Sequence, residues 1–174
     1  IFAAGLRLQS VQGLADNPLV SERVGETVTQ LDETIAELRN AIFRLNTPTI
    51  SATGRLDAII DNAASHLGFR PTLNITGDPD DLPLAVVDQL EPALSEALAN
   101  VYRHASATKV EIDLVVGEDS MVLTVADNGV GFDPRGPRGS GLDNLEARAL
   151  RLGGTSSVAS TTGKGTAVTW TAIF

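Results

Sequence analysis

Cysteine is absent from this chain of 174 residues, and histidine occurs only twice, at His66 and His104. A chain without thiols forms neither disulfides nor thiolate metal sites, and two histidines are too few for a multi-histidine metal site. Basic residues are also scarce: 13 lysines and arginines stand against 22 aspartates and glutamates, for a formal net charge of -9. Because nucleic-acid phosphates are repelled by an acidic protein without a basic patch, we expect no nucleic-acid partner.

Long apolar runs are missing as well. No segment approaches the ~20 apolar residues that span a membrane, and no basic-then-apolar signal pattern follows Ile1. We therefore expect a cytoplasmic location without membrane contact by this chain, which the lack of cysteine also fits. Apolar residues make up 43% of the chain and charged residues 20%, which favours one globular domain with a small appendage. Because the chain begins with Ile1 and not with Met, we expect a fragment of a longer protein.

Residues 1–47 are expected to form two helical segments around a turn at Asp16-Asn17-Pro18. The second segment carries a heptad seam of aliphatic residues that alternate spacings of four and three: Val24, Val28, Leu31, Ile35, Leu38, Ile42 and Leu45. So narrow a seam requires a partner helix. The partner is either the first segment, in an internal hairpin, or a second chain, in a dimeric four-helix bundle, and we favour the bundle.

Asn46-Thr47-Pro48-Thr49 breaks the helical pattern, and a mixed α and β pattern follows from Ser51 to the end. Periodicity predicts helices at 56–67, 84–104 and 142–152, and strands at 69–76, 109–116, 121–126, 155–160 and 166–174. This order predicts an α/β two-layer sandwich over residues 51–174, with helices packed on a sheet.

The helix expected at 84–104 carries the first candidate site residues. Glu96, Asn100 and His104 follow one another at intervals of four, so they share one face, roughly opposite the apolar stripe. A carboxylate and a carboxamide one turn apart suit a hard cation such as Mg²⁺ beside a nucleotide phosphate. An ordinary solvated helix face has the same composition, so this spacing alone leaves both interpretations open.

A second group follows the strand expected at 121–126. Asp127-Asn128-Gly129-Val130-Gly131-Phe132 places a carboxylate before two glycines, which let a ligand approach the backbone closely. A carboxylate at this point can accept a hydrogen bond from an exocyclic amine such as that of adenine. A plain Asp-Asn-Gly turn is the alternative interpretation.

Two further glycine motifs come later in the chain. Gly139-Ser140-Gly141-Leu142 opens a helix, whose first amides can bind an anion where no side chain intervenes. Gly163-Lys164-Gly165-Thr166 connects the last two strands, and alone it indicates no more than a hairpin. The sequence contains neither the Walker A spacing nor the G-x-G-x-x-G spacing of dinucleotide loops.

Taken in order, these four motifs resemble those of the GHKL ATPase superfamily as they occur in histidine kinases. Residues 96–105 look like the N box, 127–132 like the G1 box, 139–142 like the G2 box and 163–166 like the last glycine motif. The resemblance extends from about Ser51 to the end of the chain. It implies the Bergerat ATP-binding fold, with ATP and Mg²⁺ as ligands.

The resemblance also implies a role for each matching residue. Asp127 would accept the adenine amine with help from Thr166, beside Gly165, while Gly129 and Gly131 would let the base lie close. The other assignments concern the phosphates. Asn100 would bind Mg²⁺, Glu96 would orient or deprotonate the attacking histidine as a general base, and Arg103 or His104 would face the phosphates. The backbone of four residues would cradle these phosphates: Gly139, Ser140, Gly141 and Leu142.

The first nine residues, Ile1 to Gln9, resemble the stretch just after the phosphoacceptor motif in sensor kinases of the nitrate-sensor and desaturase-regulator type. In that family a His-Asp pair lies about two helical turns upstream, so residues 1–47 would be a dimerisation and phosphotransfer hairpin without its acceptor. The resemblance implies a homodimer in the intact protein, a response regulator as partner, and no autophosphorylation by this fragment. It also suggests a relationship to actinobacterial haem-based oxygen-sensing kinases.

One departure concerns the nucleotide lid, which would comprise only residues 133–138. A short lid excludes less water from the phosphates, so we expect weak ATP affinity.

Two other functions stay open at this point. They are a different GHKL activity, such as an anti-sigma-factor serine kinase or an ATPase of the gyrase, chaperone or mismatch-repair type, and a non-catalytic nucleotide-binding interaction module.

Overall fold

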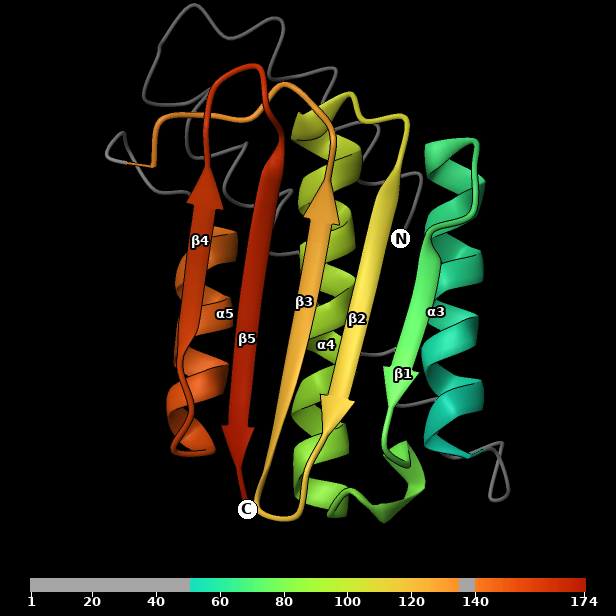
Figure 1. Cartoon of the computed structure of the whole chain (residues 1–174), viewed down its shortest axis with the longest axis vertical. Coiled ribbons are helices and arrows are strands. Elements are labelled where there is room, and N and C mark those ends of the chain that lie inside the picture. The colour runs from blue at the N-terminus through green and yellow to red at the C-terminus, as the bar shows by residue number, and fades with distance from the viewer. Residues whose placement is uncertain (1–50, 135–139) are drawn as a thin grey trace, which may run out of the picture. The chain divides into compact units, whose positions relative to one another are not determined.

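A computed structural model describes residues 51–134 and 140–174 (Figure 1). The hairpin predicted for residues 1–47 and most of the expected lid therefore lie outside the described residues. The helical elements are α3 (Ala52–Leu67), a 3-10 turn η1 (Pro79–Asp81), α4 (Leu84–Asn100), a π-helical turn η2 (Val101–Ala105) and α5 (Ser140–Arg151). The strands are β1 (Thr72–Thr76), β2 (Val110–Val116), β3 (Ser120–Asp127), β4 (Ser156–Ser160) and β5 (Thr166–Ile173).

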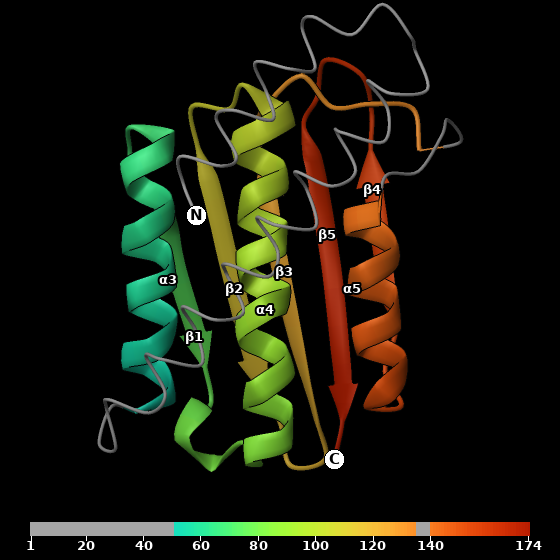
Figure 2. The ribbon, with the colours of Figure 1, turned by 180° about the vertical axis from the view of Figure 1, so that it is seen from behind.

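The strands form a five-stranded mixed sheet in the order β1-β2-β3-β5-β4. The pair β1–β2 is parallel, because α4 carries the chain back between them, and the other three pairs are antiparallel. The α-helices of the described residues, α3, α4 and α5, cover the same face of the sheet, as the view from behind shows (Figure 2). The predicted α/β two-layer fold is thereby confirmed for the described residues.

The core lies between the sheet and the helices. Alternate residues of the central strands are buried there: Val110, Ile112 and Leu114 on β2, Met121, Leu123 and Val125 on β3, and Val168, Trp170 and Ala172 on β5. The opposing layer comes mainly from α4, whose Leu90, Leu94 and Leu98 are at most 1% exposed. Each such side chain stabilises the fold by roughly 1.5–3 kcal/mol relative to an exposed position, and together they fix α4 across the middle of the sheet.

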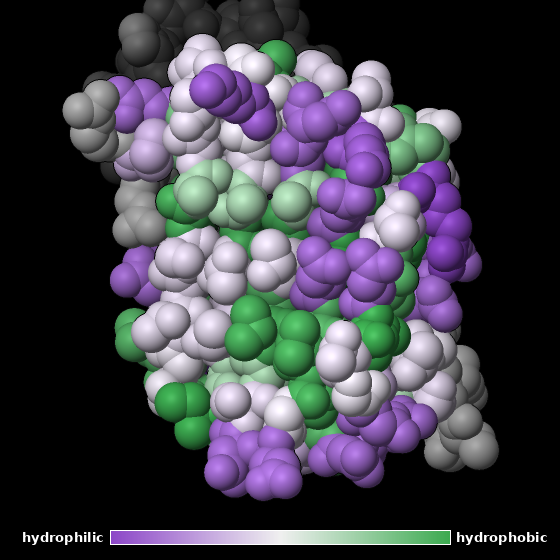
Figure 3. Space-filling model, viewed as in Figure 1, coloured by the Kyte–Doolittle hydropathy of each residue, from purple (hydrophilic) through white to green (hydrophobic). Residues whose placement is uncertain are grey.

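The opposite face of the sheet is not covered by any described element (Figure 1). Its residues are small or polar along most strands, such as Thr124 on β3 and Thr169 on β5, with Asp113 exposed on β2. Figure 3 views this face and shows hydrophilic and pale residues around a smaller hydrophobic area. This alternation of buried and open positions is what an antiparallel sheet with one packed face requires.

The C-terminal end of α4 differs from the sequence-based prediction. A regular helix was expected through His104, whereas the α-helix ends at Asn100 and continues as the wider π turn η2. Ser106 then reverses the chain in a left-handed conformation, with φ of 49°. The prediction of a regular α-helix through His104 is therefore wrong in its last turn, and His104 is exposed whereas Glu96 and Asn100 are half-buried.

Helix α3 is bounded by local signals. The hydroxyl of Ser51 accepts a hydrogen bond from the Gly54 amide (3.1 Å), and Gly68, with φ of 80°, ends the helix in the left-handed region. Strand β1 begins at Thr72, later than predicted, because Pro71 cannot donate to the sheet. These two elements lead the chain to the start of α4, which carries the first of the candidate motifs.

Candidate functional site

The motifs converge on one edge of the sheet, at the top of Figure 1. There α4 ends, β2 begins, β3 ends, and the β4–β5 hairpin turns back. Strand register places four residues side by side across this edge: Val110, Asp127, Thr166 and Ser160. We call these four residues the edge row, and all four belong to the helix-covered side of their strands, as alternation from their buried neighbours requires.

Asp127 and Thr166 are the central pair of the edge row. They are direct register partners of β3 and β5, so their side chains are neighbours at roughly 4.5–5.5 Å between Cβ atoms. One carboxylate oxygen of Asp127, Oδ1, accepts the Gly129 amide at 2.7 Å. A carboxylate has further acceptor sites, so Asp127 can hold the loop with one oxygen and receive a ligand donor with the other.

Three glycines bring the loops at this edge into backbone contact. A side chain at Gly129 would overlap the Ala105 carbonyl oxygen, and one at Gly131 would overlap that of Thr161. At Gly165 a side chain would overlap the Asp127 carbonyl oxygen, and its φ of 83° also favours glycine. Hydrogen bonds reinforce these approaches: the Val130 amide donates to Ala105 O (2.8 Å), and the Gly163 amide donates to Val130 O (2.6 Å). The glycines of the two motifs therefore fix one compact loop cluster.

Asn128 anchors the same loop to the start of β2. Its Oδ1 accepts the amides of Thr108 and Lys109, both at 2.9 Å, and its Nδ2 donates to the Thr108 hydroxyl at 2.9 Å. All of these polar atoms of Asn128 are occupied within the protein. Sequence reasoning placed Asn128 in the motif without a role, and the contacts assign it to positioning the loop.

Glu96 and Asn100 meet the start of α5. A Cβ atom on Gly141 would overlap Glu96 Oε1 and would lie 3.2 Å and 3.3 Å from Asn100 Oδ1 and Nδ2. Both side chains are half-buried, so they do not lie on a solvated helix face, which was the alternative interpretation of their spacing. The motif on α4 and the motif that opens α5 are thus in contact.

The amide nitrogen of Asn100 is buried without a hydrogen-bond partner among the described residues. An unpaired buried amide costs roughly 1–3 kcal/mol, so such a group is unusual in a packed fold. The two amide atoms can be exchanged by a flip, so either the oxygen or the nitrogen is offered. The amide group of Asn100 can donate to a phosphate oxygen through nitrogen or offer its oxygen to Mg²⁺, and Gly141 leaves space beside it, so this residue fits either ligand.

Arg103 and His104 lie on the π turn η2, and both side chains are exposed. The neighbouring Tyr102 packs edge-on against His66 of α3, with ring centroids 5.2 Å apart. The turn itself is held by the contact of Ala105 with Val130, which places it at the same edge as the other motifs. Ser140 and Leu142 lie in the first turn of α5, exposed and half-buried respectively, while Gly139 lies outside the described residues.

Residues 51–134 and 140–174 contain no group of three or more histidines and carboxylates arranged to hold a metal by themselves. No helix in this part of the chain is both long and apolar enough to cross a membrane.

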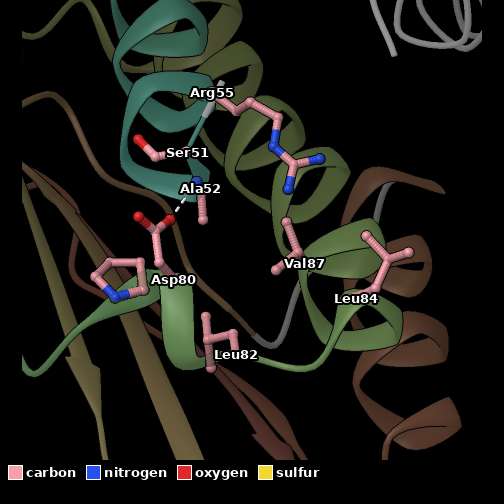
Figure 4. A pocket seen from close by; sticks show the side chains of 8 residues that line it. Ser51, Ala52, Arg55, Asp80, Leu82, Leu84 and Val87 are labelled. Carbon is pink, nitrogen blue, oxygen red and sulfur yellow. Dashed lines mark hydrogen bonds between the residues drawn. The ribbon is translucent and has the colours of Figure 1, made fainter. Parts of the chain in front are cut away.

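A cavity of about 200 Å³ opens between the N-terminal ends of α3 and α4 (Figure 4). Asp80, which accepts the Ala52 amide at 2.5 Å, and Arg55 lie on opposite sides of it. Arg55 is paired with Glu91 at 3.1 Å, so its charge is balanced within the fold. The cavity lies about 24 Å from the Asn100 end of α4, given the helix rise of about 1.5 Å per residue, and we assign it no part in the site.

Comparison with known proteins assigns the chain to a family. Residues 85–173 match the family described as histidine kinase-, DNA gyrase B-, and HSP90-like ATPase. Since the match covers just over half of the sequence, the chain belongs to this family.

Sensor protein VraS of Staphylococcus epidermidis is 26% identical over 176 residues, and VraS of Staphylococcus aureus is equally similar. These alignments cover 97% of this chain but 49% of the relatives, so the chain spans about half the length of the curated relatives it matches.

Solved structures give the same fold. The histidine kinase domain from the Erythrobacter litoralis EL346 blue-light activated histidine kinase has a TM-score of 0.63 at 19% identity, covering 99% of this chain and 95% of that one. Acinetobacter baumannii histidine kinase AdeS has a TM-score of 0.59 at 18% identity, covering 97% and 93%. The family match and the fold of these structures agree that the described residues form a domain of the histidine kinase-, DNA gyrase B-, and HSP90-like ATPase family.

Proposed function

We propose that this chain binds ATP at the sheet edge described above and supplies the kinase activity of a two-component sensor histidine kinase. The γ-phosphate would pass to a histidine on a helical acceptor segment and from there to an aspartate of a response regulator. The observation that carries the proposal is the unpartnered buried amide of Asn100 beside Glu96 and Gly141, because no role in the fold accounts for it.

The residues of the chain then have distinct tasks. Asp127 and Thr166 receive the adenine base, and the glycines 129, 131 and 165 keep the backbone close to it. Asn100 holds Mg²⁺, which when bound neutralises phosphate charge. Glu96, about one turn before Asn100, orients the acceptor imidazole and accepts its proton.

Other residues complete the phosphate side of the proposed site. The amides at the start of α5, from Ser140 to Leu142, would face the phosphates together with that of Gly139, which lies outside the described residues, and Arg103 and His104 would approach from the π turn. Catalysis rests mainly on holding donor and acceptor in line and on balancing charge, as for phosphoryl transfer in general.

The architecture of the intact protein is part of the proposal. Residues 51–174 are the catalytic domain, and residues 1–47 are a truncated dimerisation and phosphotransfer hairpin of the nitrate-sensor and desaturase-regulator type. The heptad seam supports a homodimer formed through a helical bundle. We further propose a cytoplasmic location for this part and a relationship to haem-based oxygen-sensing kinases.

The test is a calorimetric titration of the chain with Mg-ATP. Wild type should bind weakly, and Asp127→Asn should bind about ten- to a hundredfold more weakly, since it loses a hydrogen bond to a charged group. Asn100→Ala should bind ATP with little dependence on Mg²⁺. Asp113→Asn is the matched control, because this exposed carboxylate on β2 lies on the open face of the sheet and should leave binding unchanged.

Two results would contradict the proposal. One is equal loss of binding in Asp113→Asn and Asp127→Asn, which would mean that general electrostatics governs affinity. The other is the absence of any binding by the wild-type chain at millimolar ATP, both alone and after addition of an acceptor helix bundle.

A further inference from the structure

The hydroxyl of Ser160, the member of the edge row on the outer strand β4, has three polar neighbours. Its hydroxyl oxygen accepts the Phe132 amide at 2.8 Å. The same oxygen lies 2.9 Å from the hydroxyl of Thr166 and 3.2 Å from the carbonyl oxygen of Gly165. One side chain therefore joins the end of β4, the start of β5 and Phe132, the last residue of the motif at 127–132.

A count of hydrogens explains why this arrangement constrains Thr166. A serine hydroxyl has one hydrogen and two acceptor positions, and the Phe132 amide occupies one of those positions. If the hydrogen is donated to Gly165 O, Thr166 must donate its own hydrogen to Ser160. If it is donated to Thr166, that residue keeps its hydrogen for another partner. In both cases the hydroxyl of Thr166 is held in a fixed rotamer beside Asp127.

The contact with Phe132 constrains the loop in the same way. Phe132 follows Gly131, whose backbone lies against Thr161, so the two contacts hold successive residues on the β4–β5 hairpin. The hairpin and the first glycine motif are about 30 residues apart in sequence, since the separation of Phe132 and Ser160 is 28. Without Ser160 the amide of Phe132 would lose its partner.

We propose that Ser160 is a positioning residue of the nucleotide site, which orients the Thr166 hydroxyl and fixes Phe132 so that the base meets a preformed surface. The inference rests on the proposed function, because it assigns Thr166 to the base. Ser160 itself need not touch the nucleotide, and it acts through its two neighbours.

The experiment compares Ser160→Ala with Ser160→Thr, which keeps a hydroxyl, in the whole chain. Thr171→Val is the matched control, because its hydroxyl accepts the Thr155 amide at 2.8 Å near the opposite end of the same strand pair. Two quantities are measured: the exchange rate of the Phe132 amide proton without nucleotide, and the dissociation constant for Mg-ATP.

We expect Ser160→Ala to accelerate exchange at Phe132 and to weaken ATP binding about tenfold, the loss typical of one or two hydrogen bonds. Ser160→Thr should restore both values to within about threefold of wild type, and Thr171→Val should change neither. The thermal midpoints of Ser160→Ala and Thr171→Val should be similar, so that a general loss of stability does not account for the difference.

Several outcomes would overturn the inference. Unchanged ATP binding in Ser160→Ala, with Asp127→Asn still defective, refutes the role of Ser160 and leaves the proposed function intact. An equal loss in Thr171→Val makes the effect structural and refutes it as well. If wild type binds no ATP at all, the proposed function fails and the inference fails with it, even where the Phe132 amide responds as expected.

Discussion

Replacing Gly141 by alanine should damage catalysis while sparing the fold. The new methyl group would overlap Glu96 Oε1 and approach the Asn100 amide to 3.2 Å. The overlapping atom is the end of a flexible side chain, so the carboxylate can retreat while the backbone stays in place. Gly141 also lies in the first turn of α5, where alanine is tolerated well.

The expected magnitude follows from the displacement. Carbon and oxygen atoms pack at roughly 3.5 Å, so Glu96 must retreat by about 1 Å or turn to another rotamer. A misplacement of about 1 Å can cost on the order of a hundredfold in rate. We therefore expect phosphate transfer to fall about a hundredfold, ATP affinity to fall less than about fivefold, and the free energy of unfolding to change by less than about 1 kcal/mol.

The assay measures labelled phosphate transferred from ATP to an acceptor helix bundle added to the chain, for Gly141→Ala, Glu96→Ala and the double variant. If the methyl group acts by displacing Glu96, the double variant should be no slower than Glu96→Ala, because the two changes act on one group. If the rate loss of the double variant equals the product of the two single losses, this reasoning is refuted. A large loss of stability in Gly141→Ala would refute it too, because the backbone and not the Glu96 side chain would then have moved.

Two further predictions concern the fold around the site. Gly165→Ala places a methyl group against the backbone carbonyl of Asp127 at a residue with φ of 83°, so we expect a loss of about 2 kcal/mol or more in the free energy of unfolding, together with loss of ATP binding. Wild-type stability in a urea titration would contradict it. Trp170→Phe removes a 1% exposed indole whose Nε1 donates to Leu145 O at 3.0 Å. The cost should be about 1–3 kcal/mol with unchanged ATP affinity, because Leu145 O keeps its helical partner; altered affinity at full stability would contradict it.

Periodicity predicted the elements well wherever one face of an element is buried. The strands β2, β3 and β5 begin and end within one or two residues of the predicted ranges, because alternate burial of residues such as Ile112 and Leu123 leaves a clear pattern. The sequence also indicated that the four motifs belong to one site, because their order along the chain resembles that of a known family. The structure places Glu96 and Asn100 against Gly141, and the chemical roles of all three residues stay predictions.

Other features left no signal in a single sequence. The π turn after Asn100 depends on how η2 packs against Val130, a contact between residues far apart in the chain, so local spacing predicted a regular helix instead. Pro92 lies inside α4, where proline usually interrupts a helix, so local propensity alone would not predict an unbroken helix there. Ser160 was missed for a similar reason: its partners Phe132 and Thr166 become neighbours only when the hairpin folds onto the loop.

One side of helix α4 packs in the core, and another side contacts the start of α5. Because of these two contacts, the site limits which substitutions the core can tolerate. Glu96 and Asn100 lie on the same helix as the buried Leu94 and Leu98. A core substitution that shifts the helix by a fraction of an ångström therefore shifts these two side chains as well. Random mutagenesis with selection for activity should therefore return pairs of compensating changes along α4 and the strands beneath it. Substitutions at core positions far from the site would then change the reaction rate slightly. The substitutions that the core accepts would be limited by activity as well as by stability.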